Sequence, residues 1–117
     1  MALLDEMQSL GANVKEGMER VMDDQSLYEM MLGMFVDEVE KDVLAPEDFD
    51  KEDLDEVIKR VHTLKGVAGN LSITPLFDGY MEALTLLRAG DAAKAKEVFT
   101  TMLPTQEKFL DCIKRYR

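Results

Sequence analysis

The stretch from residue 54 to residue 71, LDEVIKRVHTLKGVAGNL, decides the fold that we expect for this chain. Its apolar residues recur in alternating steps of three and four, a spacing that places them on one side of an α-helix. These residues are Leu54, Val57, Val61, Leu64, Ala68 and Leu71. Asp50, with Asp53 three residues later, predicts the start of this helix. An amphipathic helix buries its apolar side against other elements, so the flanking sequence has to supply partner helices.

Two helical segments are expected before this stretch. Asn13, with Glu16 three residues later, resembles a capping box and predicts the start of a short helix. Either Asp24 or Ser26 can cap a longer helix, which ends before APEDFDKED (residues 45–53). The residues expected to be buried are Val14, Met18, Val21 and Met22 in the short helix, and Leu27, Met31, Met34, Phe35 and Val39 in the longer one.

Two more helices are expected after it. Thr74-Pro75 predicts the start of the first, because proline is tolerated in the first turn, where its missing N–H is not needed, and Gly90 can end it. Asp91 predicts the cap of the last helix, in which Pro104 predicts a kink or a short break near residue 103. The residues expected to be buried are Phe77, Tyr80, Met81, Leu84 and Leu87, then Ala95, Val98, Phe99, Met102, Gln106, Phe109, Ile113 and Tyr116.

These patterns predict an all-α protein. No stretch shows the sustained two-residue alternation that is typical of strands. Four longer helices with short connections predict an antiparallel four-helix bundle with a short additional N-terminal helical element. A chain of 117 residues is large enough for one core and too small for two, so residues 1–117 are expected to form a single domain.

The composition argues against several classes of function. The formal charge is −10, and residues 1–56 hold 18 acidic and 4 basic residues, so binding to nucleic acid is disfavoured. No apolar run approaches the roughly 20 residues that span a bilayer. The acidic N-terminus does not resemble a signal peptide, so we expect no membrane association and a cytoplasmic location. The single cysteine, Cys112, cannot form an internal disulfide and is expected to be an inert packing residue.

Metal and nucleotide sites are not expected either. One histidine and one cysteine do not make a zinc site without suitably spaced carboxylates, which the sequence lacks. The segment 48–59 resembles a calcium loop only superficially, because Asp53 stands where a glycine is needed and Lys59 where a bidentate glutamate belongs. No glycine-rich phosphate loop occurs.

His62, the only histidine, is expected on the solvent side of its helix, about 130° from the centre of the apolar stripe. Lys65 falls between core and solvent and can hold its ammonium group near the imidazole. Gly66 lies one turn beyond His62, with Gly69 beside it, although each glycine costs a helix about 1 kcal/mol relative to alanine. Taken singly, an exposed histidine is often incidental and helix glycines often serve packing. Together these residues suit phosphoryl transfer, with a nucleophile, a cation that stabilises the transferred charge, and room for an incoming protein.

HTLKG (residues 62–66), followed by VAGNL (67–71), resembles the signature of histidine-containing phosphotransfer (HPt) domains. LGANVKEGMERVMDDQSLYEMMLGMFVDE (10–38) is similar to the usual opening of that family, and LLRAGD (86–91) to its turn between the last two bundle helices. The resemblance implies a four-helix bundle whose exposed histidine takes a phosphoryl group from an aspartyl phosphate on a receiver domain and passes it on. It implies His62 as the phosphoacceptor, Lys65 as the supporting cation and Gly66 as the clearance position. We expect Gly66 and Gly69 to be docking positions.

The resemblance also implies the partners, which are response-regulator receiver domains or a hybrid histidine kinase. Magnesium is then expected on the receiver, with no metal or cofactor on this chain. We expect the chain to be a monomeric carrier and not an enzyme. Many family members carry a glutamine or glutamate on the following helix that orients the histidine ring, and straight counting places Leu84 there; Glu82 is nearby but points in another direction. If Leu84 does stand at this position, either water holds the histidine ring, or the following helix is shifted, or phosphoryl transfer is slower than usual.

Two other hypotheses stay open. The first is an acidic helical adaptor that binds a signalling partner without being phosphorylated, which the apolar Leu84 favours. The second is an enzyme that uses His62 as a general base, for which the neighbouring sequence offers only glycines and apolar residues in place of a partner acid or nucleophile.

Overall fold

The computed structural model describes residues 2–117, and every regular element in that range is a helix. The predicted all-α class is therefore confirmed. The helices in chain order are α1 (Leu3–Ser9), α2 (Val14–Arg20), α3 (Gln25–Lys41), the 3₁₀ helix η1 (Pro46–Asp50), α4 (Asp55–Asn70), α5 (Thr74–Arg88) and α6 (Ala92–Tyr116).

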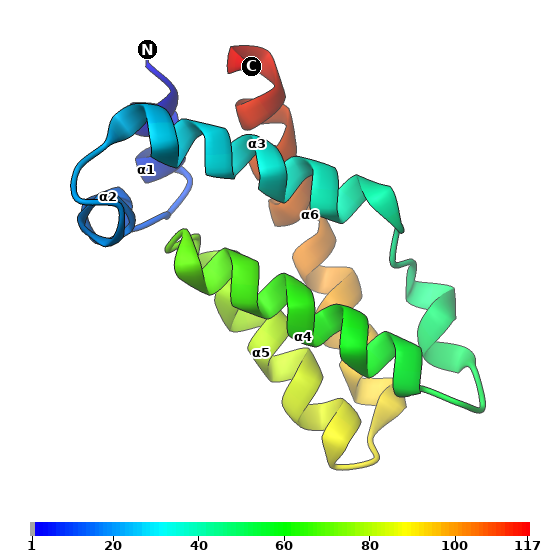
Figure 1. Ribbon diagram of the computed structural model, residues 1–117. Coiled ribbons are helices and arrows are strands. Elements are labelled where there is room, and N and C mark those ends of the chain that lie inside the picture. Colours follow the sequence, from blue (N-terminus) through cyan, green and yellow to red (C-terminus); the bar gives the residue numbers. More distant parts are fainter. Residues whose placement is uncertain (1) are drawn as a thin grey trace.

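The four long helices, α3 to α6, run in alternating directions along the chain (Figure 1). α4 packs along α5 and α5 along α6, while α3 contacts both α4 and α6. The short helices α1 and α2 lie near the end of the molecule where α4 turns into α5, and α1 contacts α6. The largest fully buried side chains come from every long helix and from α1; they include Met7, Tyr28, Phe35, Leu64, Tyr80, Phe99 and Phe109.

Most of the predicted helix ends are confirmed. The side chains of Asn13, Asp24 and Asp91 each accept a hydrogen bond from the backbone N–H three residues later, at 3.1–3.2 Å. Such caps satisfy N–H groups that have no partner inside the helix. α5 begins at Thr74, as predicted, and Gly90 follows its end with a φ of +84°, a conformation that glycine adopts without steric cost.

The start of α4 was predicted too early. Asp50 closes η1, and α4 begins only at Asp55, whose N–H donates to Asp53 Oδ1 at 3.0 Å. The reason is the burial of Phe49, whose ring packs against that of Phe99 with centroids 5.0 Å apart. Because the Phe49 ring is anchored in the core, the residues of η1 (Pro46–Asp50) form a separate 3₁₀ helix before α4, and this helix packs on α6.

The buried face of α3 differs from the prediction in part, although Phe35 and Val39 are buried as predicted. Leu27 and Met34 are exposed, and the buried positions are Tyr28, Leu32, Phe35, Val36 and Val39. Apolar residues surround most of this helix, so periodicity alone allowed two stripes. The stripe that is buried contains Tyr28 in addition to Phe35, and aromatic side chains remove the most apolar surface from water. Met22, predicted to be buried, lies beyond the end of α2 and is almost fully exposed.

Pro104 does not break the last helix, which runs without interruption from Ala92 to Tyr116. Proline lacks the N–H that would bond the carbonyl four residues earlier, which here belongs to Thr100. Both Thr100 and Pro104 lie on the exposed side of α6, where water can solvate the free carbonyl. Of the kink or short break predicted near residue 103, the break is therefore wrong, because the proline falls on the solvent side.

Candidate functional site

His62 lies in the middle of α4 with its side chain exposed, as predicted. The opposite side of the helix supplies Val57, Val61, Leu64 and Ala68 to the core. Within residues 2–117 the imidazole makes no hydrogen bond or ion pair. Its ring is therefore accessible to another molecule.

Lys65 and the two glycines follow His62 on the same side of α4. Lys65 is half-buried, and at about 100° per residue it lies about 60° around the helix from His62. Gly66 is exposed, and a Cβ atom placed there would have no heavy atom within 4 Å apart from its local helix surroundings. Gly66 therefore serves no contact between helices.

Gly69 has a different environment. A Cβ atom at this position would lie 2.9 Å from Cδ1 of Phe77, on α5. The glycine lets α5 approach α4 closely, so packing already accounts for it. At Gly66, in contrast, packing does not explain why the residue is a glycine.

Lys65, Gly66 and Gly69 line an open groove of about 590 Å³ that begins one turn beyond His62. His62 itself is not part of the groove lining. α5 contributes Phe77 and Asp78 to one wall. The remaining lining residues come from the α2 region, the last residue of α4, the α4–α5 turn and the first residue of α5; they are Asn13, Glu16, Arg20, Asn70, Ser72 and Thr74.

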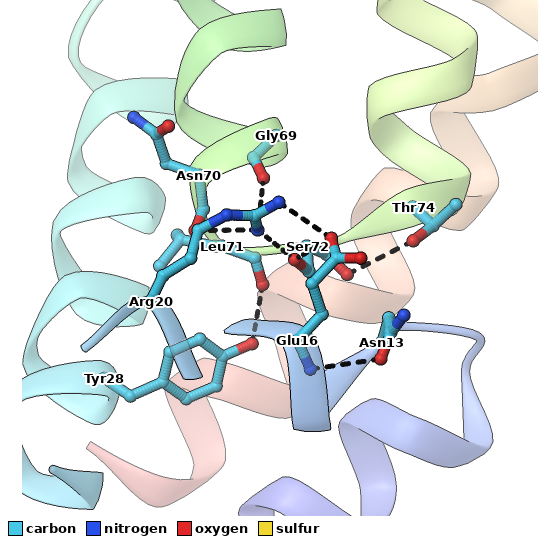
Figure 2. A network of polar contacts seen from close by, with 9 residues as sticks. All are labelled: Asn13, Glu16, Arg20, Tyr28, Gly69, Asn70, Leu71, Ser72 and Thr74. Atoms are coloured by element: carbon cyan, nitrogen blue, oxygen red, sulfur yellow. Dashed lines mark hydrogen bonds and ion pairs between the residues drawn. The ribbon is translucent and has the colours of Figure 1, made fainter. Parts of the chain in front are cut away.

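A cluster of polar contacts joins α2 to the C-terminal end of α4 (Figure 2). Nη1 of Arg20 donates to the backbone carbonyl of Gly69 at 3.0 Å and also contacts Oγ of Ser72. Nη2 of Arg20 donates to Oε1 of Glu16 at 2.8 Å, and the Ser72 hydroxyl donates to the same oxygen at 2.7 Å. The last carbonyls of a helix lack intrahelical partners and carry partial negative charge, so a guanidinium stabilises them.

The pKa values of Glu16, in the cluster, and of Tyr28, next to it, are both shifted by their surroundings. The hydrogen bond from Ser72, together with the Arg20 guanidinium, holds the pKa of Glu16 below its ordinary value of 4.5. Tyr28 packs below the cluster and donates to the carbonyl of Leu71 at 2.7 Å. Burial raises the pKa of Tyr28 to about 12, so its hydroxyl stays protonated and remains a donor.

Leu84 lies in the core face of α5 and is 1 % exposed. This is the position at which the family resemblance implies a polar group that orients the histidine ring. A buried leucine has no donor or acceptor for that task. Whatever orients His62, the side chain of Leu84 does not hydrogen-bond to it.

Three further features of residues 2–117 concern metal binding, membrane crossing and the single cysteine. No cluster of three or more histidine, cysteine, aspartate or glutamate residues in this range is placed to hold a metal ion. None of the helices in this range combines the length and the hydropathy that crossing a bilayer requires. Cys112 is buried, as expected for a packing residue, and burial is the main cause that raises the pKa of its thiol to about 11.

Fold and site define an all-helical module that presents one exposed histidine on a long helix. The family model of the Hpt domain matches residues 30–115, and the chain belongs to the Hpt domain family. Hpt domains are helical phosphocarrier modules of phosphorelays, where they interact with receiver domains and kinases and have no kinase activity of their own. No curated protein and no solved structure matches the chain significantly.

Sequence reasoning missed the cluster formed by Glu16, Arg20 and Ser72. Ser72 is 52 positions from Arg20 and 56 positions from Glu16 in the sequence. Neither of the two segments carries a local pattern that points to the other. α1 and α2 also precede the segment that the family model matches. One local signal was available, since Ser72 stands just after α4, where glycine commonly ends a helix.

Proposed function

We propose that this chain is a phosphorelay carrier in which His62 accepts a phosphoryl group from the aspartyl phosphate of one receiver domain and passes it to another. The observation that carries the proposal is the exposed His62 in the middle of α4, within the segment that matches the Hpt domain. The open face at Gly66 supports it, because a partner has to bring its own active site onto the imidazole.

The transfer is a substitution at phosphorus. The unprotonated ring nitrogen of His62 attacks, an N–P bond forms, and the bond from phosphorus to the aspartyl oxygen breaks. The aspartate leaves as a carboxylate, and the ring keeps the proton on its other nitrogen and becomes cationic. Transfer to the next receiver reverses these steps and restores the neutral imidazole.

Lys65 and Gly66 take distinct parts in this proposal. The ammonium group of Lys65 stabilises the negative charge spread over the transferring phosphoryl oxygens. Gly66 provides clearance, because in-line transfer needs the reacting atoms about 3 to 3.5 Å apart. Magnesium belongs to the receiver, and the chain works without a metal or cofactor of its own, as a monomer in the cytoplasm.

The direct test is the substitution His62→Gln. Purified receiver domains are phosphorylated and mixed with the wild-type chain, and the product is checked for acid-labile, alkali-stable phosphate, the signature of phosphohistidine. The variant should accept no phosphate and keep its melting behaviour, since an exposed residue changes stability by at most about 0.5 kcal/mol. Phosphate retained on another residue of the variant would refute the assignment.

An acidic adaptor that binds a receiver without being phosphorylated is the second candidate. The observation in its favour is that His62 has no hydrogen-bond partner within residues 2–117 and that Leu84 is apolar and buried. An adaptor would bind receivers equally well with histidine or glutamine at position 62, and the wild-type chain would carry no phosphate. Binding together with phosphohistidine in the wild type rules the adaptor out.

A further inference from the structure

The groove beside Lys65 has a wall that the segment matched by the Hpt family model does not include. Asn13, Glu16 and Arg20 come from the α2 region, which lies before residue 30. Only the folded chain brings them next to Gly66 and Gly69.

Arg20 connects this wall to α4 through several acceptors at once. Its guanidinium donates to the carbonyls of Gly69 at 3.0 Å and Asn70 at 3.4 Å, and to the side chains of Ser72 and Glu16 (Figure 2). A planar guanidinium with five N–H donors in fixed directions can serve such a set, whereas an ammonium group cannot match its geometry. The Arg20 side chain is still 44 % exposed, so it also forms part of the surface.

Ser72 provides independent evidence that this junction is specifically built. Its φ is +57°, a left-handed conformation that costs a residue other than glycine, asparagine or aspartate about 1 kcal/mol or more. Glycine would adopt it freely, but glycine has no hydroxyl to link Arg20 with Glu16. Strained residues persist where the surrounding contacts hold them, and here those contacts are the cluster itself.

A receiver that reaches His62 also has to cover this wall. A standard protein interface buries about 800 Å² on each partner, which corresponds to a disc with a radius of about 16 Å. Gly69 lies seven residues after His62, or about 10 Å along the helix axis. A receiver centred on His62 therefore extends over the groove and its α2 wall.

We infer that Arg20 is a positioning residue for receiver binding: by fixing the end of α2 to the carbonyls that end α4, it makes α2 one wall of the docking surface beside His62. This inference rests on the proposed phosphocarrier function. α2 has other anchors as well, since the N–H of Asn13 donates to the carbonyl of Ser72 at 2.8 Å and Gly17 packs closely against Tyr28. Loss of Arg20 should therefore loosen one end of α2 and leave the fold intact.

The experiment compares Arg20→Met and Arg20→Lys with the wild type. Each chain is titrated with a receiver that phosphorylates the wild type, which gives a Kd by calorimetry, and its transfer rate is measured in single turnover at saturating phosphorylated receiver. Arg115→Met is the matched control, because Arg115 also ties two helices together through a glutamate, Glu6, but lies outside the groove. Thermal melts establish that all chains are folded.

Both Arg20 variants should raise the Kd about fivefold or more and keep the saturating rate within about twofold, whereas Arg115→Met should leave both unchanged. The inference is overturned by an unchanged Kd, by wild-type binding of Arg20→Lys, by a fall in the saturating rate without a change in Kd, or by equal weakening in Arg115→Met. A wild-type chain that accepts no phosphate from any receiver would instead refute the proposed function, so the two failures are distinguishable.

Discussion

The hydroxyl of Tyr80 donates a hydrogen bond of 2.5 Å to Oε1 of Gln106, and both side chains are buried. The pair links α5 to α6, the two helices that follow the helix of His62. Burial raises the pKa of Tyr80 well above its ordinary value, so the phenol remains a donor at any ordinary pH. A buried glutamine is tolerated here because this donor satisfies it.

Replacing Tyr80 by Phe should destabilise the fold by about 1 to 3 kcal/mol, because the buried amide oxygen of Gln106 loses its partner. The double variant Tyr80→Phe, Gln106→Leu should recover most of that loss, since replacing both partners by apolar groups is often nearly neutral. Urea unfolding of the two single variants and the double variant measures the coupling. If the double variant lost as much unfolding free energy as the two single variants together, the two side chains would not interact as a pair.

Helix propensity and docking predict opposite effects of Gly66→Gln. Because Gly66 has open space around it, glutamine should stabilise α4 by up to about 1 kcal/mol. The same side chain would stand between the imidazole of His62 and a receiver, so transfer should be severely impaired. Melts and single-turnover assays on one preparation measure both effects, and full transfer activity would remove the proposed role of this glycine.

The two helix glycines should respond differently to alanine. Gly66→Ala should stabilise the protein by about 0.5 to 1 kcal/mol, whereas Gly69→Ala should gain less or lose stability, because the ring of Phe77 has to move. In a Phe77→Leu background that obstruction is smaller, so the two alanine substitutions should become more alike. If both alanine substitutions stabilise the protein equally when Phe77 is present, the Phe77 ring moves aside at no cost in free energy.

Lys65→Ala should slow phosphoryl transfer with little change in receiver affinity, because the proposed role of the lysine concerns charge that is strongest in the transition state. The rate at saturating receiver is the decisive measurement. Lys108→Ala removes an exposed lysine of α6 and serves as the control for net charge. A wild-type rate in Lys65→Ala would show that Lys65 is only a surface cation.

Glu6 should contribute to acid sensitivity. Its carboxylate accepts from Arg115 Nη2 at 2.7 Å and from the hydroxyl of Tyr116 at 2.8 Å, and these contacts, Arg115 first, lower its pKa from 4.5 to about 2. A lowered folded-state pKa stabilises the fold above the unfolded-state value, and the contribution is lost as pH falls from about 4.5 to about 2. The melting temperature of the wild type should exceed that of Glu6→Gln at neutral pH, and the difference should shrink over this range. A difference that does not depend on pH would contradict the assignment.

The sequence by itself determined the helical class, most helix ends and the exposed position of His62. These features depend on residues three or four positions apart in the sequence. A capping side chain and the backbone N–H that it accepts from are likewise within one helical turn of each other. The buried face of α4 was predicted for the same reason, because its apolar stripe has only one possible orientation. Where apolar residues surround a helix, as in α3, periodicity did not identify the buried side.

Only the tertiary structure decided which side of α3 is buried, that Pro104 falls on the solvent side of α6, and that Gly69 packs on Phe77 while Gly66 is free. It also decided that Arg20 meets the end of α4, since the contact with Gly69 joins residues 49 positions apart. Such contacts form when separate helices pack, and their geometry depends on the packing of the whole core. A local pattern contains no information about a partner that folding alone brings within hydrogen-bonding distance.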